Sequence, residues 1–324
     1  MLSLFRKNLF IYNVFLVVYC LILRHSWYFS ETSPPEEPMG LLSSFILPFT
    51  SSYPFTVKTF TILLIFYQAV ELNRLVSINR ILPINSLFPG TFYILLGSFY
   101  IEFLPLSGIW LGNTFLLFML QDLFKQTKNE ELPIRAFNMG FYGGLASLFY
   151  FPYIILPLLG VFGIMFIRTF KAIDYIRIMT GIVVPYFLTA TVLFMFGDLS
   201  MLWDNHFTQG FALFDFHFHF YWKTIALLSI FGLLVLFVIG IYSNLTNKVT
   251  MPIHRKVEML YWMLMVSIAM FFIIQNADIA SLTLTLIPLS ILVAAVFLIL
   301  PNEHFAEVVH FILFGAALGF QYTG

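Results

Sequence analysis

Long apolar runs separated by short polar segments extend along the whole chain. About eleven of the runs are long enough to cross a bilayer as helices. They lie at Leu9–Arg24, Phe55–Leu72, Phe88–Pro105, Ile109–Phe124, Phe137–Phe151, Tyr153–Ile167, Ile178–Phe196, Thr224–Tyr242, Met259–Ile274, Leu282–Leu300 and Ala306–Phe320. Because the runs are apolar on every side, they must face lipid or each other. The pattern predicts an all-α fold, a polytopic transmembrane helical bundle in which residues 1–324 form a single integral membrane domain.

Two neighbouring runs make up the segment Ala136–Lys171 and are broken only at Phe151-Pro152. Pro152 and Pro157 cannot donate backbone hydrogen bonds, so the chain can turn there and begin a new helix. The stretch Met139–Ser147 is rich in small residues, which allow a neighbouring helix to approach closely. We therefore expect a tight transmembrane hairpin that packs in the middle of the bundle.

Positive charges between the runs predict how the chain is threaded. With a cytoplasmic N-terminus, only Arg24, Lys58 and Lys223 of the sixteen lysines and arginines fall on the outside. This distribution follows the positive-inside bias of membrane proteins. The first run follows basic residues as a signal peptide does, but it is too long and no small-residue cleavage site follows. We expect it to be retained as a signal anchor.

Two predicted outward segments are longer than the others and lie near residues 30–54 and 198–222. The first contains the apolar piece Leu41–Pro48, which is too short to cross and is expected to lie in the interface or to re-enter the membrane. The second is dominated by aromatic residues, which favour the membrane–water interface. Neither segment is long enough to form a soluble domain.

Composition agrees with this class and excludes several others. The chain is 60% hydrophobic and only 10% charged, whereas a soluble domain is about one quarter charged. The formal net charge is zero, so no basic surface suggests a nucleic acid as a partner. Cys20 is the single cysteine, which rules out an internal disulfide and a cysteine-based metal site.

The central part of the chain resembles a known group of sequences. From LPINSLFPG, which begins at Leu82, to GIVVPYFL, which ends at Leu188, it is similar to an uncharacterised family of polytopic inner-membrane proteins from Bacteroidota. The resemblance covers roughly Leu72–Leu188. It implies a multi-pass protein of the bacterial inner membrane and a role in the cell envelope, and it carries no known chemistry.

A more distant resemblance is to integral-membrane glycosyltransferases of the GT-C type. It rests on an Asn-containing span, a short basic loop and a Gly-x-x-Gly-Leu-Ala helix, here Gly140, Gly143, Gly144, Leu145 and Ala146. Those enzymes take sugars from polyprenyl-phosphate carriers at the outer face and use an acid of the first outward loop as catalytic base or metal ligand. The resemblance implies a GT-C-like scaffold and a polyprenyl-phosphate lipid as partner. The acids in the corresponding loop are Glu31, Glu36 and Glu37.

The chain departs from the GT-C pattern in three respects: it has no Asp-Asp or Glu-Asp pair, its loop is short, and Phe149-Tyr150-Phe151 replaces a lysine that often follows the helix. Glycosyl transfer needs a carboxylate to deprotonate the acceptor and a cation or metal to hold the leaving phosphate. The acids of the loop are the candidate catalytic bases, and Arg24 is the candidate substrate-binding cation. Alternatively, the acids form a solvated loop and Arg24 extends to outer headgroups.

The second outward segment contains the metal-ligand types of the chain. Asp215, His217 and His219 alternate with phenylalanines, and His206 precedes them. In an extended strand the three would share one face, whereas in a helix His217 would turn away. Imidazole and carboxylate suit zinc or another divalent metal ion. The alternative is the polar edge of an aromatic belt.

Charged residues near the ends of the runs have local explanations. Asp122 lies one turn from Lys125 and Lys128, and Glu71 lies one turn from Arg74. None of these residues falls in the middle of a run, which argues against a proton-driven pump with a buried carboxylate relay. The runs also show no evident inverted repeat and no broken mid-membrane helices, which argues against a small-solute carrier.

Two functions from different classes follow. In the first, the protein handles a polyprenyl-linked sugar or lipid at the outer leaflet, as a glycosyltransferase if it is an enzyme. In the second, it is a non-catalytic subunit of an envelope machine for secretion, motility or glycan export, and its aromatic outward segment packs on a protein partner. An acid facing an outward cavity would favour the enzyme, and an apolar lateral surface would favour the subunit.

Overall fold

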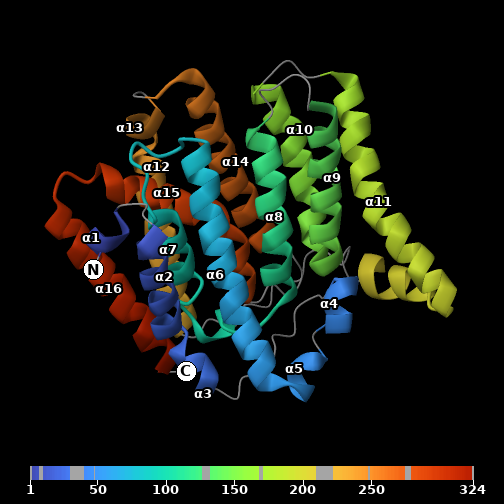
Figure 1. Ribbon diagram of the computed structural model, residues 1–324, viewed down its shortest axis with the longest axis horizontal. Coiled ribbons are helices and arrows are strands. Elements are labelled where there is room, and N and C mark those ends of the chain that lie inside the picture. Colours follow the sequence, from blue (N-terminus) through green and yellow to red (C-terminus); the bar gives the residue numbers. More distant parts are fainter. Residues whose placement is uncertain are drawn as a thin grey trace.

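The computed structural model describes residues 2–6, 10–29, 40–46, 48–125, 132–167, 171–208, 222–246, 249–273 and 279–322. All regular elements in these ranges are helices (Figure 1). The longer helices are α2 (Phe10–Leu23), α6 (Pro54–Ile78), α7 (Phe88–Leu96), α8 (Gly108–Phe124), α9 (Leu132–Phe149), α10 (Leu156–Ile167), α11 (Ala172–Phe196), α12 (Trp222–Gly240), α14 (Met251–Ile273), α15 (Leu286–Ile299) and α16 (Glu303–Tyr322). The short ones are α1 (Leu2–Phe5), α3 (His25–Phe29), α4 (Leu41–Ile46), α5 (Phe49–Ser52), α13 (Tyr242–Thr246), the 3-10 helices η1 (Ile101–Phe103), η3 (Phe151–Ile155) and η5 (Ile279–Thr285), and the π-helix η4 (Leu202–Thr208).

The predicted runs all contain a helix, so the all-helical prediction is confirmed. Among the described residues, five helical stretches are long and apolar enough to cross a membrane. They are Pro54–Ile78, Ala172–Phe196, Trp222–Gly240, Ile279–Ile299 and Glu303–Tyr322. These stretches indicate a membrane protein. The count of eleven crossings and the cytoplasmic N-terminus stay predictions.

The lateral surface of the bundle, where helices face away from the core, is apolar. Phe187 of α11 and Leu233 of α12 are 67% and 66% exposed, and both helices expose further large apolar side chains along their length. Soluble monomers rarely expose extended apolar patches. A surface of this kind is typical of helices that contact lipid.

Of the five membrane-length stretches, the one that contains α15 is the most deeply buried. Of the stretch Ile279–Ile299, 94% is buried, against 22–33% for the other four membrane-length stretches. It contacts α7, α12 and α14, and it has no polar face because protein surrounds it. In the hairpin, α9 packs between α8 and α11 (Figure 1), and half of its residues are buried.

The hairpin itself forms as expected. The first helix, α9, ends at Phe149, η3 makes the turn, and α10 begins at Leu156. On its other side α9 packs against α11 through glycines, and a side-chain carbon at Gly140 would fall on the backbone of Ile178. Small residues thus let the two helices approach closely, as the sequence predicts.

Three of the predicted runs contain interruptions. The run that starts at Phe88 ends as an α-helix at Leu96 and continues through a turn into η1; the run at Tyr153 begins as η3, and the run at Leu282 begins as η5. The absence of broken mid-membrane helices stays a prediction. Irregular backbone inside a membrane protein must find internal partners for its polar groups.

The helix ends define two ends of the bundle. At one end, which we call the loop end, α9 and α11 terminate near α4, and α6 and α8 begin (Figure 1, lower part). The sequence predicts that this end faces outward. At the other end, which we call the opposite end, α6 and α8 terminate and α13 lies (Figure 1, upper part).

Candidate functional site

The two predicted outward segments meet at the loop end. The Gly40 N–H donates to the carbonyl oxygen of Phe149, the last residue of α9, at 3.1 Å. The Ser43 hydroxyl donates to the same oxygen at 2.9 Å. The next amide along, Leu41 N–H, donates to Nδ1 of His206 in η4 at 3.3 Å. These bonds attach the start of α4 to both α9 and η4, and we call this arrangement the α4 anchor.

Glycine is required at position 40 by this close approach. A side-chain carbon there would collide with the carbonyl groups of Leu148 and Phe149. Leu41 and Ser43 are fully covered by neighbouring elements, whereas Phe45 is 46% exposed. The anchor therefore buries one side of α4 and leaves an aromatic side chain on the other.

His206 connects the anchor to the helices behind it. Because its Nδ1 accepts from Leu41, its proton lies on Nε2, which donates to the Tyr186 hydroxyl of α11 at 3.0 Å. The Tyr186 hydroxyl in turn lies 2.8 Å from Ser147 Oγ of α9, which donates to the Gly144 carbonyl. Each hydroxyl in this chain donates once and accepts once, so the polar groups are satisfied together.

Burial controls the charge of His206. The side chain is only 1% exposed, and the rings of Phe151 and Phe207 pack against it. Desolvation of the charged form lowers the pKa of His206 from 6.5 to about 4. At neutral pH the ring is therefore neutral, as the hydrogen bond from Leu41 requires.

Arg24, the candidate substrate-binding cation, lies inside the protein with its side chain fully buried. Its guanidinium donates to the carbonyl oxygens of Gly97, Phe103 and Leu104 at 3.0, 2.8 and 2.9 Å, and to Ser98 Oγ at 3.2 Å. It also lies over the ring of Trp110, 5.3 Å from the centroid. The Gly97 carbonyl directly follows α7, and the Phe103 and Leu104 carbonyls lie at the end of η1. The guanidinium thus closes the interruption in this helix, and it does not extend to the headgroups as the alternative reading expected.

The other interruptions meet a neutral polar network. Asn113 of α8 donates to the Thr283 carbonyl of η5 at 3.4 Å and accepts from the Tyr153 hydroxyl of η3 at 2.5 Å. Its Nδ2 also lies 3.4 Å from the Tyr93 hydroxyl, which donates to Gln68 of α6. Side chains from α6, α7, α8 and η3 and a backbone carbonyl of η5 therefore bond one another in the core, where they hold the irregular segments together.

The candidate catalytic acids and metal ligands lie outside the described residues. Glu31, Glu36 and Glu37 belong to residues 30–39, and Asp215, His217 and His219 belong to residues 209–221. The structure describes the segments that flank them, namely α3, α4 and η4. Of the predicted metal cluster only His206 is described, and both of its ring nitrogens are engaged. Within the described ranges no group of three His, Cys, Asp or Glu side chains could hold a metal ion.

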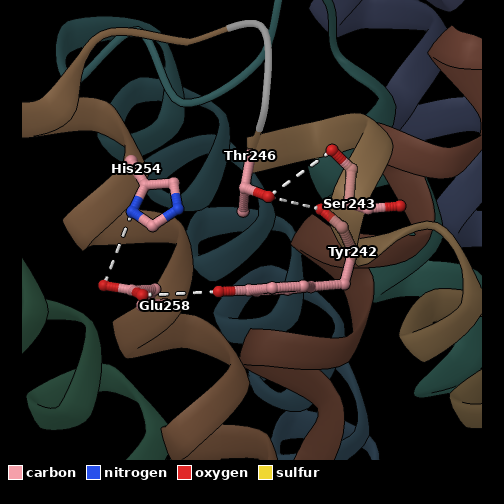
Figure 2. A network of polar contacts seen from close by, with 5 residues as sticks. All are labelled: Tyr242, Ser243, Thr246, His254 and Glu258. Carbon is pink, nitrogen blue, oxygen red and sulfur yellow. Dashed lines mark hydrogen bonds and ion pairs between the residues drawn. The ribbon is translucent and has the colours of Figure 1, made fainter.

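Charged groups at the opposite end form their own contacts. Figure 2 shows Glu258 of α14 between His254, at 3.6 Å, and the Tyr242 hydroxyl of α13, which donates to it at 3.3 Å. Thr246 donates to the Tyr242 carbonyl within α13. These contacts attach a short helix to the bundle and leave no reactive arrangement among the labelled groups.

Two of the local ion pairs can be checked. Arg74 contacts Glu71 at 3.3 Å, so this pair is confirmed. Asp122 contacts Arg135 of the next helix at 3.1 Å. The expected partners were Lys125 and Lys128, of which Lys128 lies outside the described residues. The observed pair joins α8 to α9, and the charge of Lys125 also acts on Asp122 within its own helix.

Sequence reasoning missed Tyr186 and the role of Gly40. Tyr186 is one of sixteen tyrosines and lies in an ordinary apolar run, so nothing local distinguishes it. Gly40 follows the acid-bearing segment directly, and a glycine beside a predicted interfacial helix is the one signal that could have indicated a close backbone contact. Comparison of the chain with protein-family models, with curated proteins and with solved structures finds no match in any of the three.

Proposed function

We propose that the protein is a multi-pass protein of the bacterial inner membrane, built on a GT-C-like scaffold, that handles a polyprenyl-linked sugar or a related lipid at the outer leaflet. The observation that carries this proposal is the α4 anchor. It fastens the segment that bears Glu31, Glu36 and Glu37 at its end, Gly40, to α9 and η4. The described neighbours of these acids along the chain are α3 and the start of α4.

Exposed aromatic side chains next to the anchor support a lipid as the substrate. Phe45, Phe49, Tyr53 and Phe55 follow the anchor along α4, α5 and the start of α6, and they are 46–71% exposed. Aromatic side chains of this kind favour the boundary between headgroups and acyl chains. A carrier lipid whose chain contacts them would hold its phosphate near the α4 anchor, and a carboxylate of the preceding acids would act as the base.

The test is the double substitution Glu36→Gln and Glu37→Gln, with Asp198→Asn as the matched control. Asp198 is an exposed acid that follows α11 at the same end of the bundle. Each variant is expressed in cells that lack the native protein, and envelope glycans are profiled by mass spectrometry. We expect the double variant to lose the wild-type glycan profile at normal protein levels and the control to keep it. An unchanged profile in the double variant counts heavily against the enzyme.

A second candidate is a non-catalytic subunit of an envelope complex. The last turn of α11 supports it, because Phe194, Met195 and Phe196 are 71–78% exposed and point away from the bundle core. A protein partner could cover this apolar end. Gentle purification from the native membrane followed by mass spectrometry separates the two candidates. A stoichiometric protein partner favours the subunit, and a solitary chain that carries polyprenyl-phosphate lipid favours the transferase.

A further inference from the structure

A cavity of about 650 Å³ lies at the opposite end of the bundle, between α1, the start of α7, and the corner where α15 is followed by α16. Phe88, Phe297 and Ala306 line it, and each of these side chains is at least 95% buried. These three side chains form an apolar inner wall that belongs to the bundle core, and Asn302 and His304 line the cavity near its charged rim. None of its lining residues belongs to the α4 anchor, and the cavity plays no part in the function proposed above.

The rim of the same cavity is charged with both signs. Arg6, which follows α1, and Glu303 and Glu307, in the first turns of α16, line it. Arg6 and Glu303 form an ion pair at 2.5 Å across the rim, and their side chains are 33% and 68% exposed. Exposed pairs of this kind contribute little net stability, so a ligand can replace one partner at small cost.

The position of the rim indicates the kind of ligand. It lies where two membrane-length stretches, Ile279–Ile299 and Glu303–Tyr322, end and begin. The ends of membrane-length helices lie at the level of the headgroups, and their apolar sides lie at the level of the acyl chains. A lipid beside this corner would bring its headgroup to the charged rim and its chain to the apolar wall.

We propose that this cavity binds a zwitterionic phospholipid with a primary ammonium group, as in phosphatidylethanolamine. Its phosphate pairs with the Arg6 guanidinium, and its ammonium donates hydrogen bonds to the carboxylates of Glu303 and Glu307. The Arg6–Glu303 pair is thereby exchanged for two pairs with the ligand, so the total charge of the site is unchanged. Both new contacts are charge-assisted hydrogen bonds.

The same chemistry discriminates against other headgroups. A choline headgroup has no N–H and cannot donate to a carboxylate. A glycerol headgroup has no cation, and its anionic phosphate would lie near two carboxylates, which is unfavourable. The site should therefore prefer the ethanolamine lipid over both the choline and the glycerol lipid of equal chain length.

The full-length protein is reconstituted in nanodiscs that contain equal amounts of phosphatidylethanolamine, phosphatidylcholine and phosphatidylglycerol with identical chains. It is then extracted with mild detergent, and the retained lipids are quantified by mass spectrometry. We expect enrichment of phosphatidylethanolamine, and a decrease of about five-fold in that enrichment for Arg6→Gln and for Glu303→Gln. The matched control is Arg74→Gln, which removes an exposed arginine from another ion pair at the same end and should leave the enrichment unchanged.

Ala306→Leu provides an independent variant, because it narrows the apolar wall without changing a charge. It should also reduce the retained lipid, with a thermal unfolding midpoint close to that of the wild type. Equal retention of the three lipids, or enrichment that survives both Arg6→Gln and Glu303→Gln, would overturn the proposal. Displacement of the lipid by soluble phosphoethanolamine at an equal concentration would also overturn it, since the acyl chain would then make no contribution.

Discussion

At the scale of single residues, buried polar side chains connect distant segments through hydrogen bonds. Arg24 and His206 have little or no exposure, and each bonds backbone groups of segments that are distant in sequence. An unbonded buried donor or acceptor costs about 1–3 kcal/mol. These side chains therefore favour the observed arrangement of the interrupted helix and of α4 over arrangements that would leave these buried groups without hydrogen bonds.

The first prediction concerns Arg24. Changing Arg24 to Gln should lower the free energy of unfolding by about 3 kcal/mol, because the buried carbonyl oxygens of Gly97 and Leu104 lose their guanidinium donor and that of Phe103 keeps only Trp110 Nε1. The thermal unfolding midpoint in detergent measures this. Arg74→Gln removes an arginine whose side chain is 65% exposed, and it should change stability by no more than about 0.5 kcal/mol. A variant at position 24 as stable as this control would contradict the role assigned to the guanidinium.

The second prediction concerns pH. The pKa of His206 is about 4 in the folded protein and 6.5 in the unfolded chain. Between these values only the unfolded chain takes up the proton, so the contribution of the neutral ring is complete above pH 6.5 and is lost as the pH falls toward 4. The loss amounts to at most about 3 kcal/mol.

Protonation would also place a donor at Nδ1, opposite the Leu41 N–H, and so weaken the α4 anchor. The variant His206→Asn keeps an acceptor at this point but cannot titrate. We expect the wild type to lose more stability than the variant between pH 7 and pH 4.5, as measured by unfolding midpoints in the same detergent. Equal losses would show that His206 does not control the anchor.

At the scale of elements, glycine contacts set the distance between α9 and α11. Side-chain carbons at Gly140 and Gly181 would meet the backbones of Ile178 and Phe137, respectively, which cannot move aside as a flexible side chain can. By contrast, Gly315 of α16 has no neighbouring atom within 4 Å of such a carbon. The same residue type therefore has a packing role in one helix and none in the other.

The third prediction follows from this contrast. Gly140→Ala should force α9 and α11 apart and cost about 1–3 kcal/mol. Gly315→Ala should be neutral or stabilising by up to about 1 kcal/mol, because alanine is the better helix former. Thermal unfolding of the two purified variants provides the comparison. A tolerated Gly140→Ala would mean that the helices are not held at this distance.

At the scale of the whole molecule, the distribution of charge and the helix ends predict the threading. The loop end carries the α4 anchor, and the opposite end carries most of the lysines and arginines that the structure describes. The positive-inside bias then assigns the opposite end to the cytoplasm. This assignment determines which leaflet each of the two proposed lipid sites would meet.

The fourth prediction tests that assignment with single cysteines. Both variants carry Cys20→Ala, so that each has a single cysteine. Leu199→Cys lies at the loop end, at a position that is 44% exposed, and Ile84→Cys lies at the opposite end, at a position that is 43% exposed. A membrane-impermeant maleimide should label position 199 in intact spheroplasts and position 84 only after lysis. The reverse pattern would invert the topology and exchange the leaflets.

The sequence by itself determined the helical class and the positions of the helices, because a membrane-length apolar run has few alternatives to a helix. It also determined the hairpin at Phe151-Pro152 and the close packing of the Gly140 face, since proline and glycine act through their own backbone. The candidate acids and metal ligands came from local patterns, and they lie in segments between the described helices, outside the described residues.

Only the tertiary structure decided which polar side chains act together. Nothing near Arg24 in the chain shows that its partners are the carbonyls of an interrupted helix more than seventy residues away, and nothing near His206 indicates Leu41 or Tyr186. Apolar runs of similar length also cannot reveal which of them will be buried on all sides. For α15 this burial comes from the helices that pack around it. The physical reason is that helix formation depends on local backbone chemistry, whereas the partner of a buried polar group depends on which distant segments meet.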